Sequence, residues 1–249
     1  MNSVRLAVSW LTVLPITGPA TVDRRAAGHA IALAPLVGLL LGGVAAAAMR
    51  LSVAAGLTTL LAGLLTVGLL ALLTRGMHLD GLADTADGLG SYGPPERARQ
   101  IMKSGGAGPF GVAALIFAIA IQAAAFAALA DEGRWPAIVL AVTLGRVAVV
   151  LACRRGIQAA PDSGFGTLVA GTQPLAPVLI WSVAATGWSV FAVPGNLWLG
   201  PLVTVAVLAV SVLITRHSVR RFGGLSGDVL GAAIEITVSL AAVGFSLAG

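Results

Sequence analysis

The chain has few charged residues, and the acidic ones are the scarcest. Only 10 of its 249 residues are Asp or Glu, and all charged residues together make up 10%, whereas a soluble domain usually carries about 25%. Hydrophobic residues make up 57%, and the mean hydropathy is +0.96. This composition excludes an ordinary soluble globular domain and predicts an integral membrane protein that contacts a lipid bilayer.

Aromatic residues and cysteines are also scarce. The aromatic content is 5%, and apolar and polar residues do not alternate strictly, so helices are favoured over a membrane β-barrel. Cys153 is the single cysteine, which excludes an intramolecular disulfide and a thiol cluster for zinc. The net charge of +5 is expected to mark membrane topology first, and no nucleic-acid partner is expected.

Long apolar runs predict an all-α membrane protein with about seven transmembrane helices, since about 17–25 residues cross a bilayer. The runs are 28–49, 52–74, 109–130, 135–153, 175–193, 199–215 and 229–248. Residues 1–249 are therefore interpreted as one polytopic membrane domain, with its longest polar loops at about 75–108, 154–174 and 216–228. The N-terminal segment has no A-x-A cleavage site, which favours a retained interfacial segment over a signal peptide.

Positive charges predict the orientation of these helices. With the N-terminus in the cytoplasm, 12 of the 15 Lys and Arg residues lie inside, whereas Arg50 and Arg134 lie outside and Arg146 lies within a span. This bias fits the positive-inside rule. It predicts that the three long polar loops all face the cytoplasm, and together with the family resemblance given below it leads us to expect a bacterial inner-membrane protein.

Three of the few acids crowd into the stretch "RGMHLDGLADTADGLGSYG". On a helix, Asp80, Asp84 and Asp87 lie along one stripe, and Gly81 and Gly88 share a neighbouring stripe where a ligand or another helix can approach closely. Like charges at this spacing repel each other. A divalent cation removes that repulsion, and Mg²⁺ favours a few carboxylates together with phosphate oxygens.

A second acidic pair begins the last apolar run, in "GGLSGDVLGAAIEI". Asp228 and Glu235 share a helix face, with Glu235 about 10 Å deeper at 1.5 Å per residue. An ionisable group that far inside a span is expensive and indicates a functional site. Arg146 is either a partner for Glu235, a residue that reaches back to the interface, or a phosphate contact.

Cations and glycines supply further candidates for phosphate binding. The stretch "ERARQIMKSGGAGPFGV" places Lys103 before a glycine-rich loop, in which the amide of Gly108 leads into a helix N-terminus that suits phosphate. Arg75 and His78 precede the acidic stripe and are candidate substrate contacts, with His78 also a candidate base. These groups predict a magnesium-dependent site for a pyrophosphate or phosphodiester substrate at the membrane surface.

The same residues resemble the cobalamin synthase family, the adenosylcobinamide-GDP ribazoletransferases. The resemblance lies in "RGMHLDGLADTADGL", "IMKSGGAGPFGV", "GRVAVVLACRR", "VAGTQP" and "FGGLSGDVLGAAIE", which follow in the expected order over nearly the whole chain. It implies that a ribose hydroxyl of α-ribazole, or of its 5'-phosphate, attacks the cobinamide-side phosphorus of adenosylcobinamide-GDP, and that GMP leaves. The implied partners are the corrinoid and ribazole substrates, and the oligomeric state stays open.

The resemblance also implies roles for individual residues. Asp80, Asp84 and Asp87 carry over as Mg²⁺ ligands, and Asp87, Asp228 and Glu235 as catalytic acids. The implied substrate contacts are Arg75, His78, Lys103, Gly108 and Arg146. The chain departs from the family pattern at Ser104 and Val238, where many members carry an aspartate and a glutamate.

Two other functions compete with this one. A lipid synthase of the CDP-alcohol phosphatidyltransferase kind is expected to show a D-x2-D-G-x2-A-R pattern, which "DGLADTADG" lacks. A cation- or proton-coupled transporter would use Arg146 and Glu235, but such transporters usually contain internal repeats, and no convincing repeat is present.

Overall fold

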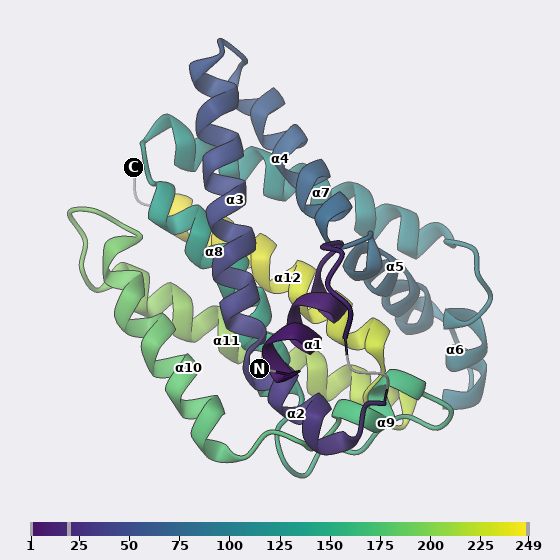
Figure 1. Cartoon of the computed structure of the whole chain (residues 1–249). Coiled ribbons are helices and arrows are strands. Elements are labelled where there is room, and N and C mark those ends of the chain that lie inside the picture. The colour runs from purple at the N-terminus through teal and green to yellow at the C-terminus, as the bar shows by residue number, and fades with distance from the viewer. Residues whose placement is uncertain (1, 19–20, 248–249) are drawn as a thin grey trace.

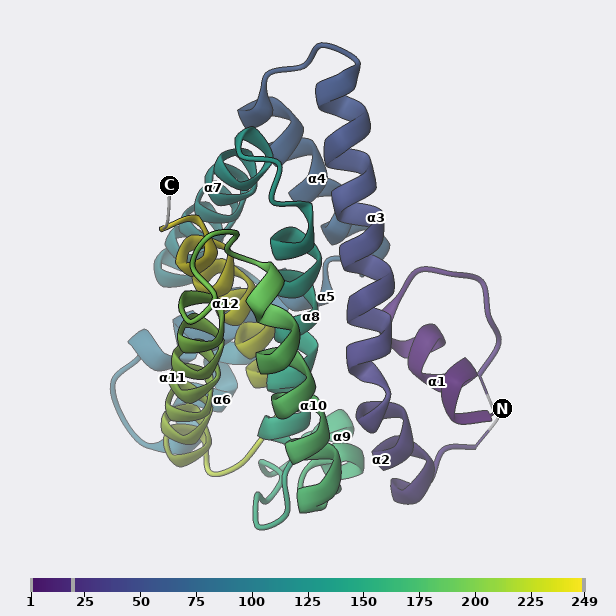
Figure 2. The ribbon, with the colours of Figure 1, turned by 90° about the vertical axis from the view of Figure 1, so that its left-hand side faces the viewer.

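The computed structural model describes residues 2–18 and 21–247, and the regular elements of that part are all helices, with two isolated β-bridges between loops. In chain order the helices are α1 Asn2–Leu11, α2 Arg24–Ala32, α3 Ala34–Ala54, α4 Thr59–Leu73, α5 Met77–Gly90, α6 Pro95–Met102, α7 Pro109–Asp131, α8 Trp135–Ala152, α9 Gly164–Val169, α10 Leu175–Trp188, the 3-10 turn η1 Ser189–Phe191, α11 Leu199–Phe222 and α12 Gly227–Ser246. Figures 1 and 2 show the long helices side by side in one bundle.

Five helices are long and apolar enough to cross a membrane, namely α3, α7, α8, α11 and α12. Helices α4 and α5 meet the same criterion together as a bent pair, which brings the number to six, while the apolar stretch 175–191 is shorter. The prediction of an all-α membrane protein is therefore confirmed. All seven predicted runs are mainly helical, although the last extends to residue 248, outside the described residues, and the count of seven spans stays a prediction.

Helix α8 lies in the middle of the bundle, between α3 and α12 (Figure 2). Small residues bring α3 unusually close to it: a Cβ atom added at Gly42 would lie 2.6 Å from the carbonyl oxygen of Val139, and one at Gly38 would lie 3.0 Å from the Cα atom of Thr143. Close backbone approach through glycine is the usual way for membrane helices to gain packing energy. The "PLVGLLLGG" segment of α3 thus serves helix packing.

The chain turns sharply between α4 and α5. Arg75 and Gly76 both have left-handed backbone angles, with φ of 56° and 67°, and the axes of the two helices differ by 94°. Such angles cost a non-glycine residue about 1 kcal/mol or more. The bend separates the apolar α4 from the acid-bearing α5.

The three long polar loops meet at one end of the bundle. The amide of Leu225, after α11, donates to the carbonyl oxygen of Gln158 at 2.9 Å, and its own carbonyl accepts from the amide of Ala160 at 3.0 Å. Arg99 on α6 donates to the carbonyl oxygen of Phe222 at 2.9 Å. Helices α2, α6 and α9 accordingly lie in the lower part of Figures 1 and 2. This grouping agrees with the predicted placement of the three loops on one side of the membrane.

Candidate active site

The three acids of α5 lie in different surroundings. Asp80 is exposed, Asp84 is half-buried and Asp87 is buried. The side chains of Asp80 and Asp84 make no hydrogen bond or ion pair to another described residue. Burial, together with the carboxylates of Asp80, Asp228 and Asp87, raises the pKa of Asp84 to about 6. The repulsion between carboxylates that the sequence predicted is therefore present at Asp84, and it includes the carboxylate of Asp228 at the start of α12.

Asp87 binds the N-terminus of α7. Its carboxylate accepts hydrogen bonds from the amides of Gly108 at 2.6 Å and Gly111 at 2.9 Å, and a Cβ atom at either glycine would collide with the carboxylate. A helix N-terminus favours an anion because its first amides have no helical partner and its dipole is positive there. Asp87 thus occupies the place that the sequence suggested for a substrate phosphate near Gly108, and the metal and catalytic roles of Asp87 stay predictions.

Glycines bring Asp228 to the acids of α5. A Cβ atom at Gly81 would lie 2.7 Å from the backbone oxygen of Asp228, and one at Gly231 would lie 3.1 Å from the backbone oxygen of His78. The backbones of α5 and α12 therefore touch where they cross. The hydroxyl of Ser226 donates to Oδ2 of Asp228 at 3.3 Å. The sequence predicted that a ligand or a helix approaches the glycine stripe, and at Gly81 the approaching group is helix α12.

A separate group of polar side chains lies inside the bundle. The Nδ1 atom of His78 is 3.9 Å from Oε1 of Glu235 and 3.5 Å from a guanidinium nitrogen of Arg146. Gln122, on α7, donates to Oε2 of Glu235 at 2.7 Å and to the hydroxyl of Ser239 at 3.2 Å. Within the described residues, Gln122 and His78 are the side chains in contact with the Glu235 carboxylate, and Arg146 contacts His78. Arg146 is therefore buried beside the histidine and not at the open surface.

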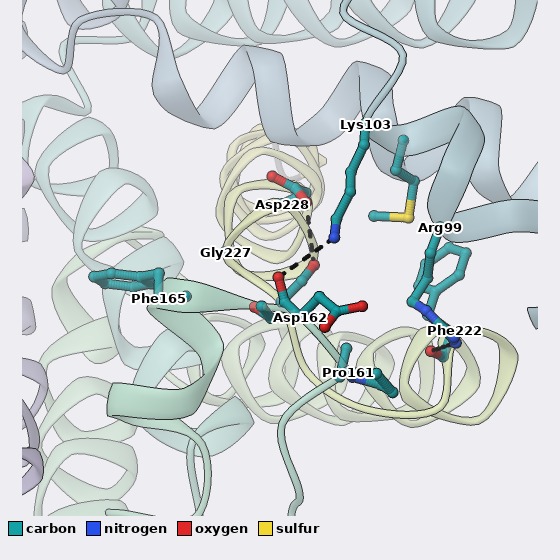
Figure 3. Close-up of a pocket in the computed structure, with 13 residues that line it drawn as sticks. Arg99, Lys103, Pro161, Asp162, Phe165, Phe222, Gly227 and Asp228 are labelled. Atoms are coloured by element: carbon teal, nitrogen blue, oxygen red, sulfur yellow. Dashed lines mark hydrogen bonds between the residues drawn. The ribbon is translucent and has the colours of Figure 1, made fainter. Parts of the chain in front are cut away.

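Two cavities meet at Asp228. The first, of about 230 Å³, is here named the lysine cavity; Figure 3 shows Lys103 pointing into it toward Asp162 and Asp228. It is lined by Arg99, Met102, Lys103, Ala160, Pro161, Asp162, Ser163, Gly164, Phe165, Phe222, Ser226, Gly227 and Asp228. The Nζ atom of Lys103 donates to the backbone oxygen of Asp162 at 3.4 Å.

The second cavity, of about 340 Å³, is here named the aromatic cavity. It is lined by Trp10, Leu11, Ile31, Arg75, Met77, His78, Asp80, Val149, Phe165, Gly227, Asp228, Leu230, Gly231 and Ile234. Phe165, Gly227 and Asp228 belong to the walls of both cavities. A ligand in one cavity therefore contacts the same three residues as a ligand in the other.

Comparison with known proteins identifies the family. The model of the cobalamin-5-phosphate synthase family matches residues 3–246. Three similar relatives are all named adenosylcobinamide-GDP ribazoletransferase: one from a Nocardioides species is 43% identical and covers 94% of each chain, one from Corynebacterium efficiens is 38% identical and covers 97% of this chain and 90% of its own, and one from Bradyrhizobium diazoefficiens is 35% identical and covers 98% and 94%. No solved structure matches the chain significantly.

The chain belongs to the cobalamin-5-phosphate synthase family. It is accordingly a transferase of cobalamin biosynthesis, as the resemblance in the sequence predicted. Membership in this family favours the transferase over the lipid synthase and the transporter.

The two departures from the family pattern lie in different places. Ser104 is exposed just after α6, where its hydroxyl donates to the carbonyl oxygen of Ile101 at 2.7 Å. Val238 is buried and lines a small internal space with His78, Arg146 and Glu235. The residue at position 104 therefore faces water near Lys103, whereas the residue at position 238 belongs to the polar group inside the bundle.

Some residues of the candidate site were missed in the sequence. Gln122 is polar in the middle of an apolar run, "AIAIQAAAF", and that contrast was an available signal. Trp10 and Phe165 reach the aromatic cavity from helices far apart in the sequence, α1 and α9. Nothing local in either segment indicates their proximity, because it arises only when the bundle assembles.

Proposed function

We propose that the chain joins adenosylcobinamide-GDP to α-ribazole, or to α-ribazole 5'-phosphate, and releases GMP, at the cytoplasmic face of the bacterial inner membrane. A ribose hydroxyl attacks the cobinamide-side phosphorus, and the bond from that phosphorus to the GMP oxygen breaks. The observation that carries this proposal is the meeting of two cavities at Asp228, beside the acids of α5 and within reach of Lys103. A two-substrate transfer needs two adjacent binding places that share the reacting centre.

The acids of α5 and α12 fit a magnesium ion by their chemistry. Among the described residues no three Asp, Glu, His or Cys side chains are already placed to share one metal ion. Mg²⁺, however, is usually held by one or two carboxylates together with water and substrate phosphate oxygens. Asp80 and Asp84, whose carboxylates have no protein partner, would hold it, and the ion would neutralise charge on the diphosphate when bound.

The remaining steps belong to the side chains of this chain. The ammonium of Lys103 and the guanidinium of Arg99 line the lysine cavity and stabilise the negative charge that develops on the departing GMP phosphate. Asp228 lies between the cavities, and its Oδ1 atom is the carboxylate oxygen that Ser226 leaves free. That atom takes the proton from the attacking ribose hydroxyl.

An assay of the purified protein tests this function. With adenosylcobinamide-GDP, an α-ribazole acceptor and Mg²⁺, GMP and a cobamide product are expected in equal amounts. Asp84→Asn is expected to lose at least about 100-fold in rate, whereas Asp131→Asn, an exposed acid at the end of α7, is the matched control and keeps full activity. Absence of GMP with either acceptor overturns the proposal, and ion flux through proteoliposomes without GMP release would favour the transporter.

A further inference from the structure

The walls of the aromatic cavity combine apolar and acidic residues. The apolar ones include Ile31, Val149 and Ile234 from three different helices. The acidic ones are Asp80 and Asp228. A matching ligand has a flat or compact apolar part and a hydroxyl-bearing part that reaches the acids.

Two aromatic rings form one side of this cavity. The indole of Trp10 and the ring of Phe165 meet edge to face, with 5.1 Å between centroids and 65° between planes. Both side chains are half-buried, so part of each ring is open to the cavity. Aromatic rings of this kind bind planar bases by stacking and by edge contacts, without regard to exact base identity.

The aromatic wall is tied to the acid-bearing helix. Arg75, in the bend before α5, donates to the carbonyl oxygens of Ser9 and Trp10 at 3.1 and 3.2 Å. The amide of Val13, just after α1, donates to the carbonyl oxygen of Leu73 at 2.7 Å. The spacing between the rings and Asp80 is therefore fixed before a ligand arrives, and this preorganisation lowers the entropic cost of binding.

The two cavities differ in which substrate they suit. The lysine cavity contains Lys103 and Arg99 and fits a diphosphate. The aromatic cavity instead offers two aromatic rings and several apolar side chains, which suit a base and a sugar better than a charged diphosphate. The aromatic cavity therefore favours the nucleoside that carries an aromatic base and a ribose hydroxyl over the nucleoside diphosphate.

We infer that the aromatic cavity binds the acceptor nucleoside, with its base against Trp10 and Phe165 and its ribose directed to Asp228. The donor diphosphate then binds in the lysine cavity on the other side of Asp228. This assignment rests on the proposed function. It makes Trp10 and Phe165 the residues that hold the base of the acceptor.

Binding of α-ribazole without a donor tests the inference apart from turnover. Isothermal titration of the detergent-purified protein with α-ribazole is expected to show a dissociation constant about 10-fold or more weaker in Trp10→Leu, as expected for the loss of one base–aromatic contact. Trp10→Phe is expected to retain most of the affinity. Trp198→Leu, which changes an exposed tryptophan away from the cavity, is the matched control and leaves binding unchanged.

Steady-state kinetics identify which substrate is affected. Trp10→Leu and Phe165→Leu are expected to raise the KM for α-ribazole. Trp10 lines the aromatic cavity but not the lysine cavity, so Trp10→Leu is expected to leave the KM for adenosylcobinamide-GDP within about 2-fold, whereas Lys103→Ala raises the donor KM. Phe165→Leu does not change α1. It therefore measures the effect of the aromatic wall on acceptor binding even if a change at Trp10 disturbs folding. A raised donor KM with an unchanged acceptor KM would place guanine in this cavity and overturn the inference.

Failure of the inference and failure of the proposed function give different results. If wild-type protein releases GMP and binds α-ribazole, but both aromatic variants bind it as tightly as wild type, the acceptor lies elsewhere and the inference is wrong. If wild-type protein neither binds α-ribazole nor releases GMP, the proposed function itself fails.

Discussion

At the scale of single residues, the acids of α5 divide into two kinds. Asp87 is held by two amides at the start of α7. Asp80 and Asp84 have no partner among the described side chains, and burial together with the neighbouring carboxylates raises the pKa of Asp84. Helical spacing alone aligned all three on one stripe. Asp87 differs from the other two because its partner Gly108 lies 21 residues further along the chain. A local sequence pattern does not predict a contact at that distance.

This division predicts opposite effects of two similar substitutions. Asp87→Asn replaces one accepting oxygen by an amide nitrogen that cannot accept, so it is expected to destabilise the protein by about 1 kcal/mol, as the loss of a helix cap does. Asp80→Asn removes a repelling charge and is expected to abolish GMP release without lowering the melting temperature. Thermal melting in detergent and the GMP assay check both; an unchanged melting temperature in Asp87→Asn contradicts the capping role.

The raised pKa of Asp84 predicts how Mg²⁺ and pH act together. Because this pKa is about 6 in the folded protein and 3.8 ordinarily, the folded state binds the extra proton between these values, and the metal-free protein loses stability as pH rises from about 4 to about 6. A proton on Asp84 also competes with a metal ion. Mg²⁺ is therefore expected to raise the melting temperature more at pH 7.5 than at pH 5.

Asp84→Asn provides the control for this measurement. The amide does not titrate and carries no charge, so the variant is expected to lose both the pH dependence and most of the Mg²⁺ effect. Melting curves with Mg²⁺ and with EDTA at the two pH values are compared with those of Asp131→Asn. A full response to Mg²⁺ in Asp84→Asn removes this residue from the metal site.

At the scale of helices, the crossing of α5 and α12 builds the site. The sequence predicted the helix of α5, its glycine stripe and the start of α12. It did not predict that His78 meets Glu235 deep inside the bundle, nor that the chain bends by 94° before α5. The bend depends on the left-handed backbone conformation of Arg75, which non-glycine residues rarely adopt. The local sequence therefore disfavours the bend, and the packing of the assembled bundle stabilises it.

Adding a methyl group at the crossing is expected to separate the two helices. In Gly81→Ala, the new Cβ atom would lie 2.7 Å from the backbone oxygen of Asp228, so α12 must shift, at a cost of about 1–3 kcal/mol. Activity is expected to fall because Asp228 moves away from α5. The matched control is Gly43→Ala, at a helical glycine with open space around it, which is expected to gain up to about 1 kcal/mol. Equal melting temperatures and rates for the two variants contradict the proposed crossing.

At the scale of the whole molecule, composition predicted the class and charge predicted the grouping of the loops. Hydropathy alone located the five helices that are long and apolar enough to cross a membrane, because apolar length is the main signal of a span. It placed the first boundary too early, since residues 24–32 form a separate helix, α2. The contacts of Leu225 and Arg99 across the loops depend on tertiary assembly, which the sequence does not show locally.

The orientation of the bundle is tested by cysteine labelling. Cys153 is buried, so background labelling is expected to be low. A membrane-impermeant maleimide is expected to label Ser104→Cys only in inverted vesicles and Ala55→Cys only from outside intact cells, because these exposed positions lie at opposite ends of the bundle. The reverse pattern places the acids of α5 on the outer face and contradicts the proposed orientation.

The bend after α4 also sets the depth of the catalytic groups. With 15 residues, α4 is about 22 Å long at 1.5 Å per residue, which is shorter than the hydrocarbon layer of about 30 Å. If α4 spans from the outer headgroup level, α5 is expected to begin below the level of the inner lipid headgroups, and the bilayer is expected to thin around it so that water and substrates reach Asp80. The turnover rate is then expected to depend on the acyl-chain length of the surrounding lipids, and to be higher with short chains that reduce this hydrophobic mismatch.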